Sequence, residues 1–252
     1  MRTAALSAAL SGVLLLAGCD SPKPQTLVVF AAASLTKAFT DLGGAFTDAA
    51  SDAGVELSFA GSADLLTQLT QGAEADVFAS ADSATMDKAA RAGLLAGPPV
   101  SFASNTLTIA VAPGNPKGIK SFRDLADVSL VVCAAQVPCG SALARLQTET
   151  GLQLRPVSEE SSVSDVLNKV TSGQADAGLV YLTDARAAGD GVSVVPFPEA
   201  AGAVNTYQIA VLETSRDTAL ARRFVDLVTG AAGRQALEAA GFGKALPLPS
   251  AS

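Results

Sequence analysis

The chain has 252 residues and a formal net charge of −7, and 49% of its residues are hydrophobic. This acidic balance, with no Trp and no run of Lys or Arg, argues against a nucleic-acid partner, because phosphate binding needs clustered cations and base stacking needs aromatic side chains. The absence of His excludes a Ser-His-Asp or Cys-His triad and any histidine-based metal site.

The first 18 residues are typical of an export signal. Arg2 precedes an apolar stretch that runs through 13–16, and the sequence Leu-Ala-Gly-Cys then ends at Cys19. This ending is typical of bacterial lipoproteins, in which the Cys is lipidated and becomes the first mature residue; a plain secretory cleavage site is the alternative. We therefore expect a signal peptide at 1–18, a lipid-anchored tether at 19–25, and export to the outer face of the cytoplasmic membrane.

Two serines stand where a predicted strand gives way to a helix. Ser34 lies in Phe-Ala-Ala-Ala-Ser-Leu (30–35) and Ser62 in Phe-Ala-Gly-Ser-Ala-Asp-Leu (59–65), beside residues too small to block the backbone. A helix N-terminus exposes unpaired N–H groups and the positive end of the peptide dipole, so each serine can direct an N–H and a hydroxyl toward an oxyanion. The alternative is an ordinary N-cap that satisfies only its own helix. Because the whole protein is acidic, an anion would have to be held by such local dipoles.

Apolar runs alternate with helical patterns along the rest of the chain, which is typical of α/β proteins with parallel strands. We predict strands at 27–31, 56–60, 77–79, 107–112, 129–133, 153–157, 177–180, 192–195 and 207–212. Two segments, 163–170 and 220–228, have the spacing of amphipathic helices.

The chain is long enough for one large or two modest α/β cores, and we expect two lobes. The turn residues Pro113-Gly-Asn-Pro116 follow a strand, so the chain could cross between lobes there, and a return is expected near 207–212. The predicted division assigns 26–107 and 208–252 to the first lobe and 108–207 to the second.

The chain contains three cysteines. Cys19 is assigned to lipid, which leaves Cys133 and Cys139 across the end of an apolar run. In an exported protein such a pair favours a disulfide over a metal or redox site. A ring this short would stabilise the fold by only about 2 kcal/mol in the chain-entropy model, and its main effect would be to fix a loop.

Five segments match one known family in order, along nearly the whole mature chain and without large gaps. They are Phe-Ala-Ala-Ala-Ser-Leu-Thr at 30–36, Ala-Asp-Val-Phe-Ala-Ser-Ala-Asp at 75–82, Val-Pro-Cys-Gly at 137–140, Gly-Leu-Val-Tyr at 178–181 and the closing Gly241-Phe242. Together they resemble the substrate-binding protein of molybdate ABC importers. The resemblance implies the type II periplasmic-binding-protein fold, in which two α/β lobes joined by a hinge close on one tetrahedral oxyanion, molybdate or tungstate.

The resemblance also assigns the ligand-binding residues. It places serine ligands at Ser34 and Ser62, backbone N–H ligands at Cys139 and Val163, and a phenolic hydroxyl at Tyr181. The alternatives are a simple core side chain for Val163 and a tyrosine bonded to a carbonyl for Tyr181. No cofactor is implied, and the metal would be bound as its oxyanion without direct protein ligands.

Two positions depart from the family pattern. Gly61 stands where the family more often has a small polar residue, and Cys139 where it often has a small apolar one. Because the expected contact at Cys139 is a backbone N–H, the substitution need not abolish binding. A disulfide to Cys133 would preorganise the loop, whereas a free thiol would leave its geometry open.

The resemblance implies a monomeric solute-binding protein, not an enzyme, that delivers its oxyanion to a membrane permease. The ATPase would be a separate subunit, since this chain has no Gly-x-x-x-x-Gly-Lys-Ser/Thr loop. One alternative keeps the fold and changes the ligand to sulfate, phosphate, iron or a small organic acid. A carboxylate ligand would call for an arginine, which no candidate site segment supplies, although Arg145 and Arg155 lie nearby in the sequence. Another is a serine hydrolase with Lys37 or Lys169 as base, without a nucleophile elbow. A third is a purely structural lipoprotein.

Overall fold

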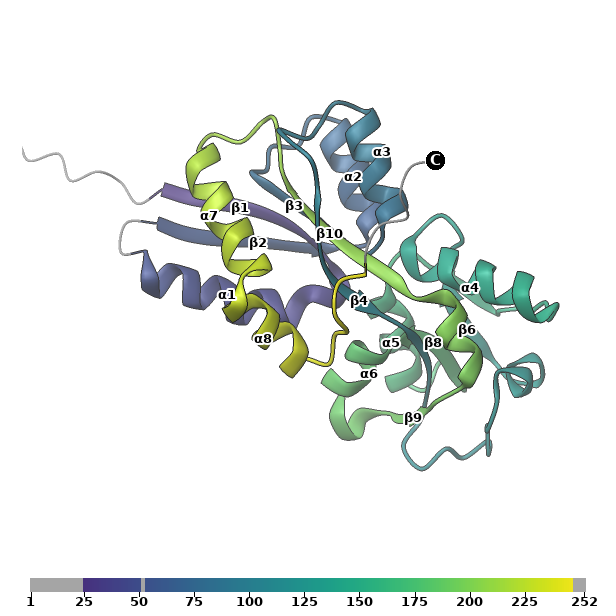
Figure 1. Ribbon diagram of the computed structural model, residues 1–252. Coiled ribbons are helices and arrows are strands. Elements are labelled where there is room, and N and C mark those ends of the chain that lie inside the picture. The colour runs from purple at the N-terminus through teal and green to yellow at the C-terminus, as the bar shows by residue number, and fades with distance from the viewer. Residues whose placement is uncertain (1–24, 51–52, 247–252) are drawn as a thin grey trace, which may run out of the picture.

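The computed structural model describes residues 25–50 and 53–246. The expectations for the signal peptide, for Cys19 and for all but the last residue of the tether lie outside these residues. Within them the chain forms two α/β lobes, each built on a five-stranded sheet (Figure 1). No helix in this part of the chain combines the length and the hydropathy needed to cross a membrane.

The sheet of the first lobe has the strand order β2-β1-β3-β10-β4. Its strands are β1 (Gln25–Ala32), β2 (Ala53–Ala60), β3 (Val77–Ser80), β4 (Val100–Asn105) and β10 (Asn205–Val211). The helices of this lobe are α1 (Thr36–Ala49), α2 (Ser62–Thr70), α3 (Ser83–Arg91), α7 (Thr218–Thr229) and α8 (Ala231–Ala239). Two separate clusters of buried side chains, one that includes residues of α1 and α7 and one that includes residues of α2 and α3, show that helices cover both faces.

The sheet of the second lobe has the order β7-β6-β8-β5-β9. Its strands are β5 (Leu107–Val111), β6 (Leu130–Cys133), β7 (Ser158–Glu160), β8 (Ala177–Tyr181) and β9 (Ser193–Val195). The helices are α4 (Pro138–Thr150), α5 (Val163–Thr171) and α6 (Leu182–Ala187), and short 3-10 turns lie at Phe122–Asp127, Gly189–Gly191 and Pro198–Ala203.

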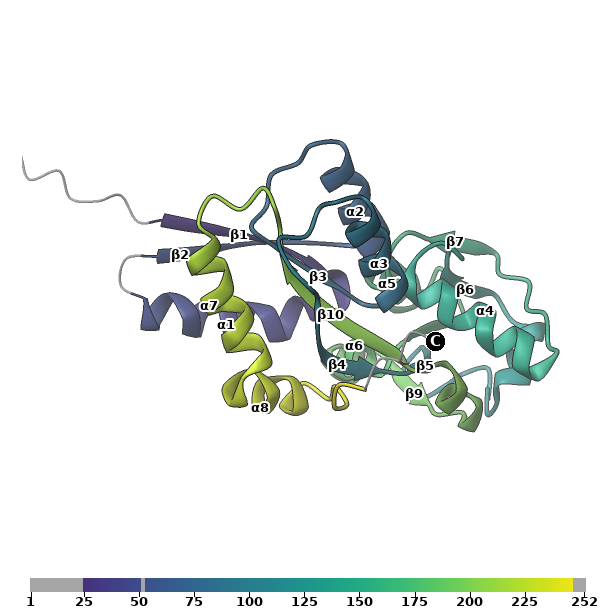
Figure 2. The ribbon, with the colours of Figure 1, turned by 45° about the horizontal axis from the view of Figure 1, so that its top comes forward.

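The chain passes between the two sheets at Thr106 and at Val204. β4 ends at Asn105 in the first sheet and β5 begins at Leu107 in the second, while β10 begins at Asn205 back in the first. Two views show β4 and β10 running from the first lobe toward the second (Figures 1 and 2). A crossing at Pro113–Pro116 is therefore wrong, because β5, the strand before that turn, already pairs with β8 and β9. The expected return at 208 is also too late, since Asn205, Thr206 and Tyr207 already pair with β4.

Both sheets are mixed, in contrast to the parallel arrangement expected from the sequence. β5 runs antiparallel to β8 and β9, and β10 runs antiparallel to β3 and β4. These two strands are the ones that follow the crossings between lobes. The remaining pairs, β1 with β2 and β3, and β6 with β7 and β8, are parallel as expected.

One predicted strand is wrong and one strand was not predicted, each for an identifiable reason. The strand expected at 153–157 is irregular, and β7 forms only afterwards; Pro156 lacks the N–H that a ladder needs. β4 was missed because its inner end is polar: Ser104 and Asn105 are buried without any apolar pattern to mark them.

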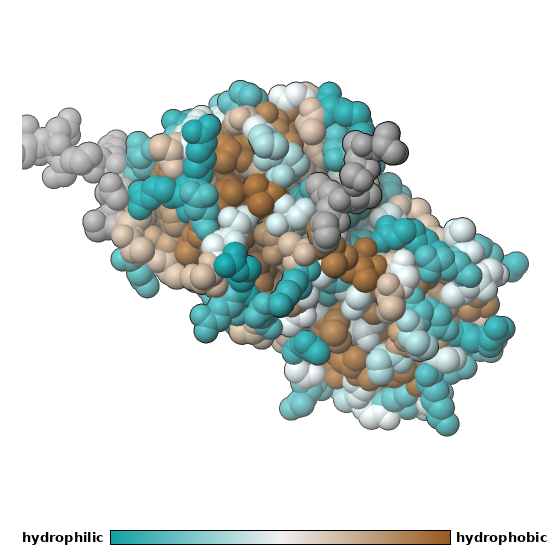
Figure 3. All heavy atoms as spheres, in the orientation of Figure 1, coloured by the Kyte–Doolittle hydropathy of each residue, from teal (hydrophilic) through white to brown (hydrophobic). Residues whose placement is uncertain are grey.

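On the face shown in Figure 3, polar side chains cover much of the outward surface of the helices, and apolar ones show between the elements.

Candidate functional site

All five predicted ligand residues line one small cavity between the lobes. Ser34 and Ser62 come from the first lobe, and Cys139, Val163 and Tyr181 from the second. The cavity has a volume of about 20 Å³, so a compact guest would contact both lobes at once. Its other lining residues are uncharged, and most are small: Ala32, Ala33, Gly61, Ala81, Val137, Pro138, Ser161 and Ser162.

The two serines do not act as N-caps. Ser34 lies in the 3-10 turn Ala33–Leu35 that joins β1 to α1, and its Oγ lies 2.8 Å from the hydroxyl of Tyr207. Ser62 is the first residue of α2, and its Oγ accepts a hydrogen bond of 3.0 Å from the N–H of Ala81. Neither side chain accepts an N–H from its own helix. The N-cap alternative is therefore wrong for both residues.

A disulfide between Cys133 and Cys139 ties the end of β6 to the first turn of α4, which confirms the pairing predicted from the sequence. The chain doubles back so tightly here that a Cβ on Gly140 would lie 1.9 Å from the carbonyl oxygen of Ala134, so only glycine fits. Cys139 is in the first helical turn, where a backbone N–H has no acceptor within the helix. The N–H is thus available to a guest in the cavity that Cys139 lines.

Val163 is the first residue of α5 and lines the same cavity. The hydroxyl of Ser162 caps this helix by accepting the N–H of Asp165. The N–H of Val163 has no acceptor within the helix, because Val163 is its first residue. The side chain of Val163 is buried in the core, as in the alternative interpretation, and this burial is compatible with a backbone N–H that faces the cavity.

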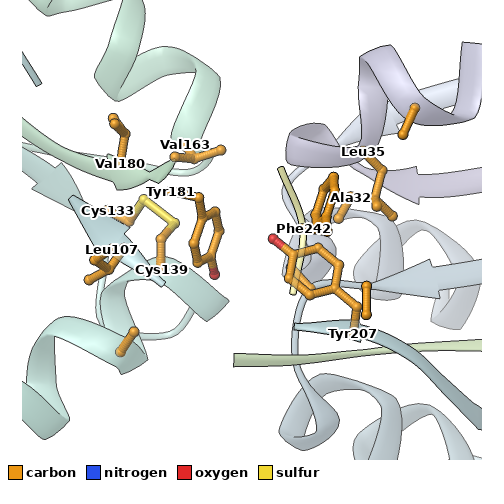
Figure 4. Packing of buried hydrophobic residues seen from close by; sticks show 14 of the residues in the cluster. Ala32, Leu35, Leu107, Cys133, Cys139, Val163, Val180, Tyr181, Tyr207 and Phe242 are labelled. Atoms are coloured by element: carbon orange, nitrogen blue, oxygen red, sulfur yellow. A yellow bond between two sulfur atoms is a disulfide. The ribbon is translucent and has the colours of Figure 1, made fainter. Parts of the chain in front are cut away.

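Tyr181 ends β8 and is almost fully buried. Its hydroxyl oxygen accepts a hydrogen bond of 2.6 Å from the side-chain amide of Asn205, so its partner is not the carbonyl of the alternative interpretation. Figure 4 shows Tyr181, Val163 and the disulfide on one side of the site and Tyr207, Phe242 and Ala32 on the other. The rings of Tyr181 and Tyr207 are 6.0 Å apart.

The cavity presents hydroxyl protons to a guest. The N–H of Ala81 and the amide N–H of Asn205 can only donate, so the protons of Ser62 and Tyr181 remain for another acceptor. Burial raises the pKa of the Tyr181 hydroxyl well above its ordinary value, with smaller contributions from Tyr207 and Asp82. Tyr181 therefore keeps its proton at neutral pH and has it available for a guest.

No charged side chain lines this cavity. Within the described residues, no group of three or more His, Cys, Asp or Glu is placed to hold a metal ion. The positive ends of α2, α4 and α5 meet here instead, since Ser62, Cys139 and Val163 all lie in first helical turns. Neutral donors converging from several directions suit a small guest with several acceptor oxygens.

The two lysines considered as catalytic bases have other partners. Lys37 forms an exposed ion pair with Asp41 on α1, and Lys169 pairs with Glu160 on β7. Lys169 also donates to Ser158, and this cluster lowers the pKa of Glu160, chiefly through the hydrogen bond from Lys169. Neither lysine has a hydrogen bond to Ser34 or Ser62.

Sequence reasoning missed four residues beside the site. Asn105, Asn205 and Tyr207 are buried. Asn205 donates a hydrogen bond to the hydroxyl of Tyr181, the hydroxyl of Tyr207 is bonded to that of Ser34, and Asn105 donates to Tyr207. Asp184 is 9% exposed, and its Oδ2 is buried without a hydrogen-bond partner among the described residues. Asp184 lines a second, larger cavity of about 450 Å³, to which Ser34 also contributes. One signal was available: the chain has only two tyrosines, and both lie at this site.

Comparison with known proteins points to one family. The family model described as bacterial extracellular solute-binding protein matches residues 27–243. The molybdate-binding protein ModA of Mycobacterium tuberculosis (strain H37Rv) is 54% identical over 97% of this chain and 100% of its own length. The molybdate-binding protein ModA of Escherichia coli (strain K12) is 29% identical over 95% of each chain.

A solved structure has the same two-lobed architecture. The periplasmic molybdate-binding protein of Azotobacter vinelandii superposes with a TM-score of 0.73 at 24% identity, and the match covers 88% of this chain and 100% of that one. The fold is thus that of a two-lobed solute-binding protein, with the candidate site between the lobes.

Proposed function

Because the chain belongs to the bacterial extracellular solute-binding protein family, we propose that it captures molybdate or tungstate between its lobes and delivers it to an ABC permease. The observation that carries this proposal is the cavity lined by Ser62 and Tyr181. Each of their hydroxyl oxygens already accepts a hydrogen bond from the protein, so each hydroxyl proton is available to a guest. Such a cavity offers protons and no charge. A membrane permease with separate ATPase subunits completes the transport system.

Molybdate at neutral pH is a tetrahedral dianion whose oxygens are all acceptors. We propose that it receives hydrogen bonds from the hydroxyls of Ser34, Ser62 and Tyr181 and from the backbone N–H groups of Cys139 and Val163. The first turns of three helices add favourable dipoles. The bound dianion loses its water and gains a shell of fixed neutral donors.

Selectivity follows from size and protonation. A cage of fixed dipoles cannot shrink onto a smaller oxyanion, so sulfate would leave its hydrogen bonds too long. Phosphate carries a proton at neutral pH, and none of the five proposed contacts is a carbonyl or carboxylate that could accept it. Tungstate has the same shape and charge as molybdate and should bind alike.

Closure brings the lobes into direct contact at Gly61. A Cβ at this position would lie 2.2 Å from the carbonyl oxygen of Ser161 in the second lobe. The absence of a side chain at Gly61 thus permits the approach that encloses the cavity. A ligand held between the lobes stabilises this closed form only through the contacts it gains there.

The family binds solutes outside the cytoplasm, and this chain is a binding protein rather than an enzyme. The finer placement is part of the proposal: the mature protein is monomeric and is anchored by lipid on Cys19 to the outer face of the cytoplasmic membrane. Mass spectrometry of the N-terminal peptide of the mature protein should show a diacylglyceryl group on Cys19. An unmodified thiol at Cys19, or a mature chain that begins elsewhere, would contradict the anchor.

Isothermal titration of the purified protein with molybdate, tungstate, sulfate and phosphate at matched ionic strength tests the proposed function. We expect saturable binding of molybdate and tungstate and much weaker binding of the other two. Equal affinity for sulfate, or no heat with molybdate, would contradict the assignment.

A further inference from the structure

Two asparagines face each other at the point where the chain passes between the lobes. Asn105 is the last residue of β4 and Asn205 the first residue of β10, and the two are partners in the β4–β10 ladder. Both side chains are nearly fully buried. We propose that this pair fixes the direction of the hydrogen bonds at the anion cavity, so that Ser34 and Tyr181 are left with protons to donate.

The orientation of the Asn205 amide is set by its partners. Its Oδ1 accepts from the guanidinium of Arg145, which can only donate, and its Nδ2 donates to the carbonyl oxygen of Pro138 at 3.0 Å, which can only accept. The Nδ2 therefore also donates to the hydroxyl oxygen of Tyr181. With its oxygen accepting this bond, the Tyr181 hydroxyl directs its proton elsewhere, and Tyr181 lines the cavity.

The Asn105 amide is oriented in the same way. Its Oδ1 accepts the N–H of Thr106 at 3.0 Å, so its Nδ2 points toward the hydroxyls of Thr183 at 2.8 Å and Tyr207 at 3.4 Å. Tyr207 then accepts from Asn105 and donates to Ser34 across 2.8 Å. Ser34 is left with its own proton for the cavity that it lines.

Two chains of hydrogen bonds therefore reach the site through the crossing strands: one from Arg145 on α4 through Asn205 to Tyr181, and one from Asn105 through Tyr207 to Ser34. Burial raises the pKa of both tyrosines far above the ordinary value, so neither chain is broken by deprotonation. The chains also give Arg145 a role: it acts on the anion through Asn205 and does not line the cavity. Asn105 and Asn205 are thus positioning residues, and they act through the hydroxyls.

The inference rests on the proposed function and is tested by replacing each amide with a carboxylate. In Asn105→Asp both Nδ2 partners are hydroxyls that can reverse, so Tyr207 would donate to the carboxylate and Ser34 would donate to Tyr207 instead of the guest. In Asn205→Asp the hydroxyl of Tyr181 would turn to the carboxylate. Each variant should lower molybdate affinity by about 10- to 100-fold, as expected for one lost hydrogen bond to a charged group.

A crossed double-mutant cycle separates positioning from a general effect of charge or structure. Asn105→Asp should add little to Ser34→Ala, and Asn205→Asp should add little to Tyr181→Phe. The crossed combinations, Asn105→Asp with Tyr181→Phe and Asn205→Asp with Ser34→Ala, should multiply their losses. Asn168→Asp on the exposed face of α5 makes the same charge change away from the site and should leave affinity within about twofold.

The outcomes are distinct. Losses that multiply equally in matched and crossed pairs, or unchanged affinity in both asparagine variants, would overturn the inference while leaving the proposed function in place. Absence of molybdate binding by the unaltered protein would overturn both. A carboxylate at position 205 would face the Pro138 carbonyl, so if that variant fails to fold, Asn205→Ser and the Asn105 cycle decide the question.

Discussion

The buried carboxyl of Asp184 should make the stability of this protein fall as pH rises. Asp184 lies in the first turn of α6, and its Oδ2 is buried with no hydrogen-bond partner among the described residues. Burial raises its pKa from 3.8 to about 7, and the hydrogen bond from its own N–H opposes this shift without cancelling it. The folded protein therefore holds a proton that the unfolded chain releases near pH 4.

The sign and size of the effect follow from proton linkage. Because the pKa of Asp184 is higher in the folded protein than in the unfolded chain, the stability that its protonated carboxyl contributes is lost as pH rises from about 4 to about 7. Above about pH 7 the contribution of Asp184 is constant. Each pH unit between the two pKa values corresponds to about 1.4 kcal/mol, so the penalty approaches about 4 kcal/mol at pH 8. Asp184→Asn removes the ionisable group and should remove this penalty.

Urea unfolding followed by far-ultraviolet circular dichroism measures the effect, since the chain has no Trp for fluorescence. The difference in unfolding free energy between Asp184→Asn and the unaltered protein should grow by about 4 kcal/mol from pH 4 to pH 8. Its pH dependence is the test, because an unpaired amide adds a constant cost of its own. Carboxyls with lowered pKa, such as Asp124 and Glu160, contribute equally to both proteins and cancel.

The exposed Asp190 on the turn after α6 provides a matched control. Asp190→Asn should run parallel to the unaltered protein at every pH. A difference for Asp184→Asn that stays flat between pH 4 and pH 8 would show that the carboxyl is ionised in the folded protein and would refute the reasoning.

Three further changes test the site. Ser62→Ala should weaken molybdate binding by about 1.5 to 3 kcal/mol in isothermal titration, as expected for the loss of a hydrogen bond to a charged group. Thr67→Ala on the exposed face of α2 is the control and should leave the affinity unchanged. Equal affinities of Ser62→Ala and the unaltered protein would remove Ser62 from the site. Reduction of the Cys133–Cys139 disulfide should lower the free energy of unfolding by about 2 kcal/mol, measured by urea titration with and without reductant. A variant with both cysteines replaced by Ser is the control and should be insensitive to reductant. An unfolding free energy that does not change on reduction would show that the disulfide does not stabilise the fold. Gly61→Ala places a Cβ against the Ser161 carbonyl and should reduce molybdate affinity at least about tenfold, or about 1.4 kcal/mol. Gly54→Ala, whose Cβ would lie in open space, is the control and should leave the affinity unchanged. Unchanged affinity in Gly61→Ala would mean that the lobes do not meet at Gly61 when the ligand binds.

Much of the fold could be predicted because most strands are short apolar runs between helical patterns. β1, β3, β6 and β8 lie within a few residues of their predicted positions. β4 could not be found in this way, because its buried end is polar and has no apolar pattern to mark it. The mixed pairing was hidden for a different reason: strand direction depends on where the chain crosses, and Thr106 carries no turn signal.

The candidate site was predicted unevenly. The small residues around Ser34 and Ser62, together with the family resemblance, pointed to residues that do share one cavity; that they contact the ligand stays a prediction. The residues that orient them were missed because their contacts are long-range: Ser34 and Tyr207 are 173 positions apart, and Asn105 and Tyr207 are 102 apart. A local pattern records what a residue can donate. It does not record which distant group occupies its oxygen.

Neutral donors select among anions only if their directions are fixed in advance. A lysine or arginine in the cleft would attract sulfate and molybdate alike, since both are dianions and a flexible cation adjusts to either. A serine or tyrosine hydroxyl that could rotate would also accept a protonated anion, because it can donate or accept. The N–H of Ala81 and the amide of Asn205 reduce that freedom at Ser62 and Tyr181, because a hydroxyl oxygen that already accepts one hydrogen bond directs its proton away from that donor. The proposed selectivity therefore depends on the groups that hydrogen-bond to the ligand-binding hydroxyls as much as on those hydroxyls themselves.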